Sequence, residues 1–288
     1  GSSSAGISGG ISIKTGNAAA PGGVQVVVGA SKVDSSSLAS PQHLKGGSIV
    51  LAAGATNGKH GTGGDVLLTG GTGTNEHFAD GGNGGSVGIR GGSSLGKNKD
   101  LDVGGNATIN GGFAASSSGG SIVIISGQGV TSSSGGVEIR SHDSGKAGSS
   151  GEVSLVSGTA TKGFSGSVHI GVGSSRSGIG GGVSIFSGRS EHKSGGSINI
   201  TAGHTTDNAR GGSIRLQTGD SAKSGSGHGI FSTPLSVAQS GSLAFTTGSS
   251  SKEGSGQIVL ATGDSRKSAG DLSVVVGKSL RDNGGSIL

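Results

Sequence analysis

The sequence predicts an all-β fold, a β-solenoid built from repeats of about 15 residues. Three observations lead to this prediction. A short phrase recurs at a fixed period, its aliphatic residues alternate with other residues, and the composition lacks the large side chains of an ordinary core.

The recurring phrase reads Gly-Gly-Ser, aliphatic, any residue, aliphatic, any residue, small residue, Gly. Clear copies occupy 119–127, 195–203 and 211–219. In the middle of the chain the first aliphatic positions are spaced by 15 or 16 residues: Ala107, Ile122, Val137, Val153, Val168, Val183, Ile198 and Ile214. A fixed period of this kind is typical of a chain that stacks one small unit many times.

Within each phrase the two aliphatic residues and the small residue fall at positions i, i+2 and i+4, as in Val153, Leu155 and Ser157. This period of two predicts a short strand with one buried face. One phrase per coil gives a thin solenoid of 15-residue coils. The alternative places two phrases in a coil of about 30 residues, with the aliphatic faces meeting as a two-sheet sandwich. The period alone does not separate the two arrangements.

The composition excludes several classes of protein. The chain has 67 Gly among 288 residues, only 6 Phe, and no Cys, Met, Trp or Tyr. Without Cys there is neither a disulfide framework nor a cysteine metal site. Gly, Ser and Val disfavour helix, and no stretch has the length and apolarity of a membrane span. The net charge of +5 is spread along the chain, and the chain has few aromatic residues. Both observations argue against nucleic-acid binding, which needs a basic patch or aromatic stacking.

The repeat predicts one continuous domain over 1–288. It is less regular at 31–104, where insertions lengthen three loops, and it contains a degenerate copy at 226–240. In that copy we place the first aliphatic position at Ile230, and Pro234 removes a backbone donor. The last residues lack a distinct capping repeat, so we expect the chain to be part of a longer array or to add head to tail.

The sequence offers no convincing catalytic centre, metal site or cofactor site, so we expect that the protein is not an enzyme. None of the eight His residues pairs with another at ligand spacing. Asp220-Ser221 and Asp264-Ser265 resemble a hydrolase serine, but both occupy the same loop position of the repeat, which favours a role in turns. A carbohydrate-active β-helix or an ice-binding solenoid is a weaker alternative.

The positions between the aliphatic pairs often carry further apolar residues. Val123, Ile125, Val156 and Phe186 are candidate contacts for lateral assembly, although strand propensity alone also accounts for such residues. Asn106 and Asn199 match the glycosylation sequon. The sequence does not separate a functional sequon from a chance match.

The Gly-Gly-Ser-Ile-x-Ile-x-Ser-Gly phrase resembles tandem repeats in very long extracellular proteins of algae and related protists. The resemblance implies a surface or appendage role, for example in flagellar hairs or another fibre. We therefore expect a structural subunit of an extracellular filament, fibre or sheath, located outside the cell or on its surface. Its partner is expected to be further copies of itself, with glycans as additional partners, and without nucleic acid or membrane insertion. The alternative is a surface adhesin that uses the inserted loops of 31–104.

Overall fold

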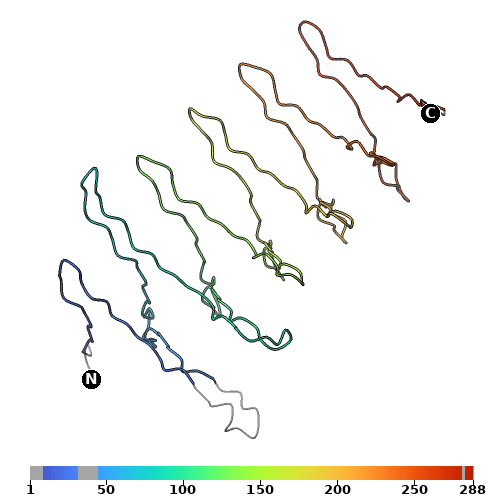
Figure 1. The fold of residues 1–288 in the computed structure, drawn as a ribbon. Coiled ribbons are helices and arrows are strands. Elements are labelled where there is room, and N and C mark those ends of the chain that lie inside the picture. Colours follow the sequence, from blue (N-terminus) through green and yellow to red (C-terminus); the bar gives the residue numbers. More distant parts are fainter. Residues whose placement is uncertain (1–8, 32–44, 281–282, 288) are drawn as a thin grey trace. The chain divides into compact units, whose positions relative to one another are not determined.

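The computed structural model describes residues 9–31, 45–280 and 283–287. The chain divides into two units, Gly1–Val153 and Ser154–Leu288. In both units the described residues form no helix and no β-strand, and Figure 1 shows extended stretches joined by tight turns. The repeat is therefore visible as alternation between extended phrases and loops.

The prediction of an all-β solenoid is wrong in both of its forms, the 15-residue coil and the 30-residue sandwich. A strand requires a ladder of backbone hydrogen bonds to a neighbour, at a spacing of about 4.8 Å. No such ladder joins phrases within the described residues. The sequence pattern specifies which side chains share a face, but it does not supply the partner that would convert an extended phrase into a strand.

The predicted alternation of faces is nevertheless present inside the phrases. Arg140 Nε lies 2.7 Å from Glu138 Oε1, and Arg215 Nε donates to Gln217 Oε1 at 3.0 Å. Both pairs join residues i and i+2, which share one face of an extended backbone. These polar pairs occupy the positions between the aliphatic residues. The period of two is therefore a local property of the chain.

Most backbone hydrogen bonds of the described chain close the loop between two successive phrases. We call the Gly five residues after the first aliphatic position the corner glycine. The donor is the glycine two residues before the first aliphatic residue of the following phrase. Its N–H donates to the C=O of the corner glycine. The pairs, donor first, are Gly64–Gly54, Gly85–Gly71, Gly105–Gly92, Gly120–Gly112, Gly135–Gly127, Gly196–Gly188, Gly212–Gly203, Gly227–Gly219 and Gly285–Gly277.

These loop-closing bonds explain the Gly-Gly pairs better than backbone chirality does. Among the described residues, positive φ occurs at Gly148, Gly163 and His60, and none of these is a corner glycine. Glycine is required because the two backbone segments joined by the bond approach each other closely. A Cβ on Gly120 would lie 2.9 Å from the Gly112 nitrogen, and a Cβ on Gly212 would lie 3.0 Å from the Gly203 nitrogen.

The loop-closing bonds also correct the register of the degenerate copy. The bond from Gly227 to Gly219 places the first position of this copy at Gly229 rather than at Ile230. Phe231 then shares the aliphatic face, and Ile230 lies on the other face. A shift of one residue exchanges the two faces of an extended segment. The exposed fractions agree, at 64% for Phe231 and 81% for Ile230.

A test of the loop-closing bond is the substitution Gly120→Ala. We expect the new methyl group to push the chain away from Gly112 and to weaken the 2.8 Å bond from Gly120 N–H to Gly112 O. One net hydrogen bond contributes about 1 kcal/mol, so exchange of the residue 120 amide should accelerate about fivefold. The control is Gly112→Ala, because no atom lies within 4 Å of that added Cβ. Equal exchange rates of the residue 120 amide in the two variants would show that the hydrogen bond does not require glycine at position 120.

Candidate interaction surface

The described residues build no hydrophobic core, because none of their side chains is buried. The chain exposes 29245 Å². A compact protein of 288 residues exposes about 11,000 Å², and its unfolded chain about 39,000 Å². The large exposed area therefore lies much closer to the unfolded value. The repeated aliphatic residues of the phrases form much of this exposed surface.

The exposure of the aliphatic residues follows the phrase. In the copy at 119–127, Ile122 and Ile124 are 52% and 66% exposed, while Val123 and Ile125 are 73% and 83% exposed. The face predicted to point inward is thus the less exposed one, yet more than half of it is open to solvent. We call the first and third positions of each phrase the aliphatic face, and the second and fourth positions the outer face.

The outer-face residues that the sequence singled out are exposed in the structure. Val156 is 83% exposed and Phe186 is 85% exposed, close to the values of Val123 and Ile125. Their exposure is compatible with lateral contacts, and it is equally compatible with a role in backbone propensity alone. The same holds for the sequon residues, since Asn106 and Asn199 are both exposed.

A shallow apolar cavity lies between two successive phrases of the second unit. Its volume is about 390 Å³, and its lining residues are Leu216, Gln217, Thr218, Gly229, Ile230 and Phe231. A Cβ added at Gly229 would lie 3.6 Å from Thr218 Cγ2, so this position of the degenerate copy faces the end of the preceding phrase. The cavity has the mainly apolar lining that accepts an aliphatic side chain.

The backbone of the phrases forms a second exposed feature. Within the described residues, the backbone–backbone hydrogen bonds belong to loops, and none joins one phrase to the next along its length. Exposed N–H and C=O groups in an extended segment are a template for pairing with another chain. Aliphatic side chains and free backbone groups thus occur together on each phrase.

The inserted loop at 72–83 is held by its own side chains. Asn75 Nδ2 donates to Asp80 O at 2.8 Å, and Asn75 Oδ1 accepts from the His77 N–H at 3.1 Å. His77 Nδ1 accepts from the N–H groups of Ala79 and Asp80, and the ring stacks on Phe78 with centroids 5.0 Å apart. The sequence analysis missed this network, which an Asn two residues before a His could have suggested.

The inserted loop at 93–104 has an equivalent but separate network. Asp102 Oδ2 accepts from the Asn98 N–H at 2.7 Å, and Asn98 Oδ1 accepts from the Asp100 N–H at 3.0 Å. The Asp102 N–H returns a bond to Asn98 O at 2.9 Å. Both inserted loops are therefore locally ordered. The third insertion, at 31–45, falls largely outside the described residues.

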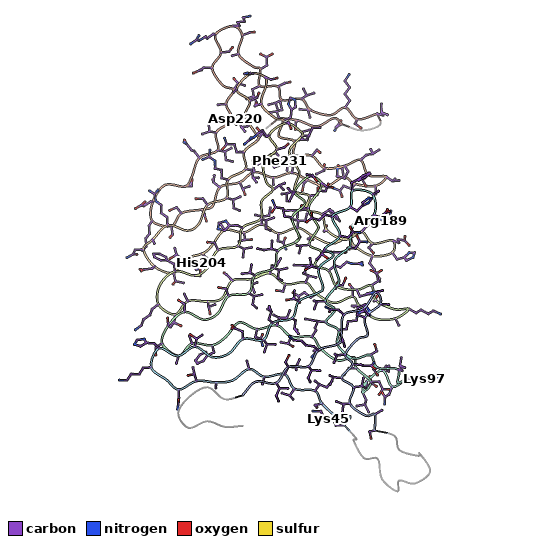
Figure 2. All side chains as sticks on the ribbon, turned by 90° about the vertical axis from the view of Figure 1, so that its left-hand side faces the viewer. Lys45, Lys97, Arg189, His204, Asp220 and Phe231 are labelled. Carbon is purple, nitrogen blue, oxygen red and sulfur yellow. The ribbon has the colours of Figure 1, made fainter. Side chains whose placement is uncertain are left out.

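The serine residues that resembled a hydrolase motif have the turn role that their repeat position predicts. Ser221 Oγ accepts from the Ser224 N–H at 3.0 Å, and Ser265 Oγ accepts from the Lys267 N–H at 3.2 Å. Ser190, Ser175 and Ser250 act in the same way in their loops. Arg189, His204 and Asp220, which are labelled in Figure 2, each follow a corner glycine directly.

Among the described residues, no group of three or more His, Asp or Glu side chains could hold a metal ion. No helix there is long and apolar enough to cross a membrane. The structure thus brings none of the sequence's polar candidates together into one site.

The arrangement defines a tandem-repeat chain whose notable surface is aliphatic and periodic. Comparison with protein-family models, with curated proteins and with solved structures finds no match.

Proposed function

We propose that this chain is a structural subunit of an extracellular fibre or sheath, in which further copies of the same chain cover the aliphatic face. The observation that supports the proposal is the absence of any buried side chain among the described residues, together with the 29245 Å² of exposed surface. Burial of apolar area is the main favourable term in folding, at about 25 cal/mol per Å². A chain that leaves this surface open gains that term by association.

The repeat favours a second copy over an unrelated partner. Each phrase presents an aliphatic face, and from Ala107 to Ile214 the phrases recur every 15 or 16 residues, so that a copy of the chain presents a matching spacing. The contact can then be repeated along the whole length. If the second copy is displaced by one repeat, the contact does not close and further copies add, which produces fibres. The cavity lined by Leu216 and Phe231 provides an additional binding site for an aliphatic side chain of the second copy.

The experiment that tests the proposal combines sedimentation with electron microscopy over a range of protein concentrations. We expect ordered fibres above a critical concentration and slowly sedimenting single chains below it. Monodisperse single chains at the highest soluble concentration would contradict the proposal. The extracellular location belongs to the same proposal, and exposed Asn106 and Asn199 would be accessible to glycosylation.

A test of lateral contacts uses the outer face. We expect Val123→Lys combined with Ile125→Lys to separate lateral bundles into single filaments, because two charges replace two aliphatic side chains that are 73% and 83% exposed in the single chain. Bundle width in electron micrographs is the measurement. The control is Glu138→Lys with Arg140 unchanged, which adds a cation to the outer face of the next phrase without removing an apolar group. Unchanged bundles in the Val123/Ile125 variant would remove these residues from the lateral contact.

A surface adhesin that uses the inserted loops is the second candidate. It is favoured by the hydrogen bonds that order 72–83 and 93–104, since ordered loops present fixed side chains to a ligand. The two candidates differ in a simple observation. An adhesin retains its binding as a single chain and loses it when these loops are shortened to the length of a regular repeat, whereas assembly is unaffected by that change.

A further inference from the structure

One phrase of the chain is aliphatic on both of its faces. Ile122, Val123, Ile124 and Ile125 form the only run of four Val, Ile or Leu residues in the sequence. With a serine at each end they make up the segment 121–126, which contains no Gly, no Pro and no charged residue. Short segments with high β-propensity, low net charge, no Pro and few Gly are typical of strands that stack between identical chains.

The charged residues of the chain lie far from this segment. The nearest Asp, Glu, Lys or Arg residues are Asp102 and Glu138, and 103–137 is the longest stretch of the sequence without a charge. The chain also has five runs of three Val, Ile or Leu residues, each within four residues of a charge: 26–28 near Lys32, 49–51 near Lys45, 66–68 near Asp65, 258–260 near Asp264 and 274–276 near Lys278. The segment 121–126 therefore combines the longest aliphatic run with the longest uncharged surroundings.

The segment is exposed and has no partner within the chain. Its four aliphatic side chains are between 52% and 83% exposed. Two loop-closing bonds lie on either side of it, from Gly120 N–H to Gly112 O and from Gly135 N–H to Gly127 O. Among the described residues, the N–H and C=O groups of 121–126 take part in no hydrogen bond. Both the backbone and the side chains of the segment are thus open to a second chain.

We infer that two copies of the chain first associate at the segment 121–126, which pairs with the same segment of the other copy as parallel, in-register strands. This inference rests on the proposed function, because it names the segment that begins the assembly. The strands form between copies. The fold of the single chain, which has no strand in its described residues, is not changed by the inference.

The distribution of charge favours pairing of this segment with itself. In-register stacking places each residue on the identical residue of the next copy, at about 4.8 Å. A charge in the paired region then lies against a like charge, which destabilises the pairing. No such repulsion arises over 103–137, whereas pairing at 66–68 or 274–276 would bring Asp65 or Lys278 against its own copy. Association is therefore expected to begin at 121–126.

The test follows assembly of the full chain by light scattering, with and without added fragments of preformed fibres. The key variant is Ile124→Pro, because proline has no N–H and interrupts the hydrogen bonds between strands. The matched control is Ile200→Pro. Both residues occupy the third position of a Gly-Gly-Ser-Ile phrase, and both are 66% exposed. Within the described part of the chain neither N–H donates a hydrogen bond, so neither substitution removes an existing one.

Without fibre fragments, Ile124→Pro should lengthen the delay before fibres appear at least about tenfold, and Ile200→Pro less than about threefold. With fragments present, the first association is no longer needed, and the two variants should extend fibres at similar rates because each loses one backbone donor per added copy. The variant with Val123→Lys and Ile125→Lys adds charge to the segment, so its filaments should also appear after a longer delay.

The register is tested at Ser121, whose side chain is exposed. Ser121→Lys and Ser121→Glu should each lengthen the delay, because like charges then lie against each other in the stack. An equimolar mixture of the two variants should restore the delay to within about twofold of the unmodified chain, since opposite charges can then alternate. An antiparallel pair would place residue 121 near residue 126 of the other copy, and the mixture would give no such recovery.

Equal delays of the two proline variants in the absence of fragments would overturn the inference, while the fibres themselves would leave the proposed function standing. A delay confined to Ile124→Pro, without recovery in the mixture of Ser121 variants, would overturn the in-register arrangement. If the unmodified chain forms no fibres at any soluble concentration, the proposed function fails and this inference fails with it.

Discussion

A dilute solution of the unmodified chain is expected to show no cooperative unfolding peak in scanning calorimetry. A compact protein of 288 residues would absorb about 200 kcal/mol near 60 °C, at about 0.7 kcal/mol per residue. That heat arises from disruption of a packed interior. The described residues provide none, since no side chain is buried and the backbone bonds close loops rather than join phrases.

The same measurement above the critical concentration should show a peak whose midpoint rises with protein concentration, because association stabilises by mass action. The appropriate control is the dilute sample concentrated and measured again, which separates association from irreversible change. A large cooperative peak that is independent of concentration would mean that a single chain forms its own core. Such a result would contradict both the exposed aliphatic face and the proposal that depends on it.

Assembly is expected to fail when two residues of the aliphatic face become acidic. The variant combines Ile198→Asp and Ile214→Asp, at the first positions of two regular phrases. Each substitution removes about 2 kcal/mol of apolar burial in the assembly and adds the cost of desolvating a carboxylate. The critical concentration should therefore rise at least about 100-fold, as measured by sedimentation.

The control variant, Asn199→Asp with Gln217→Asp, adds two negative charges to the outer faces of the same two phrases. It should raise the critical concentration by less than about tenfold. In the single chain, neither variant should change the far-ultraviolet circular dichroism, because Ile198 and Ile214 are 51% and 53% exposed there. Equal effects of the two variants on assembly would show that the contact does not distinguish the two faces.

The sequence predicted several local features that the structure confirms. Ser221 and Ser265 accept backbone hydrogen bonds in turns, as their position in the repeat predicted. The alternation of faces within a phrase is visible in the pairs Glu138–Arg140 and Arg215–Gln217. These features involve residues a few positions apart, so the residues themselves and the steric rules of the backbone are sufficient to specify them.

Other features could not be obtained from the pattern. The one-residue shift of the degenerate copy depends on a bond between Gly227 and Gly219, and the order of the 72–83 loop depends on which groups Asn75 and His77 reach. Neither bond leaves a periodic trace in the sequence.

The sequence by itself determined the repeat, its period, the two faces of each phrase and the positions of the turns. All of these depend on short-range geometry, which is the same in every copy. The tertiary structure decided that the phrases do not pair into a sheet and that the aliphatic face is left open. The physical reason is that a strand depends on backbone partners as well as on its own residues, and within the described part of this chain each phrase lacks a backbone partner along its length.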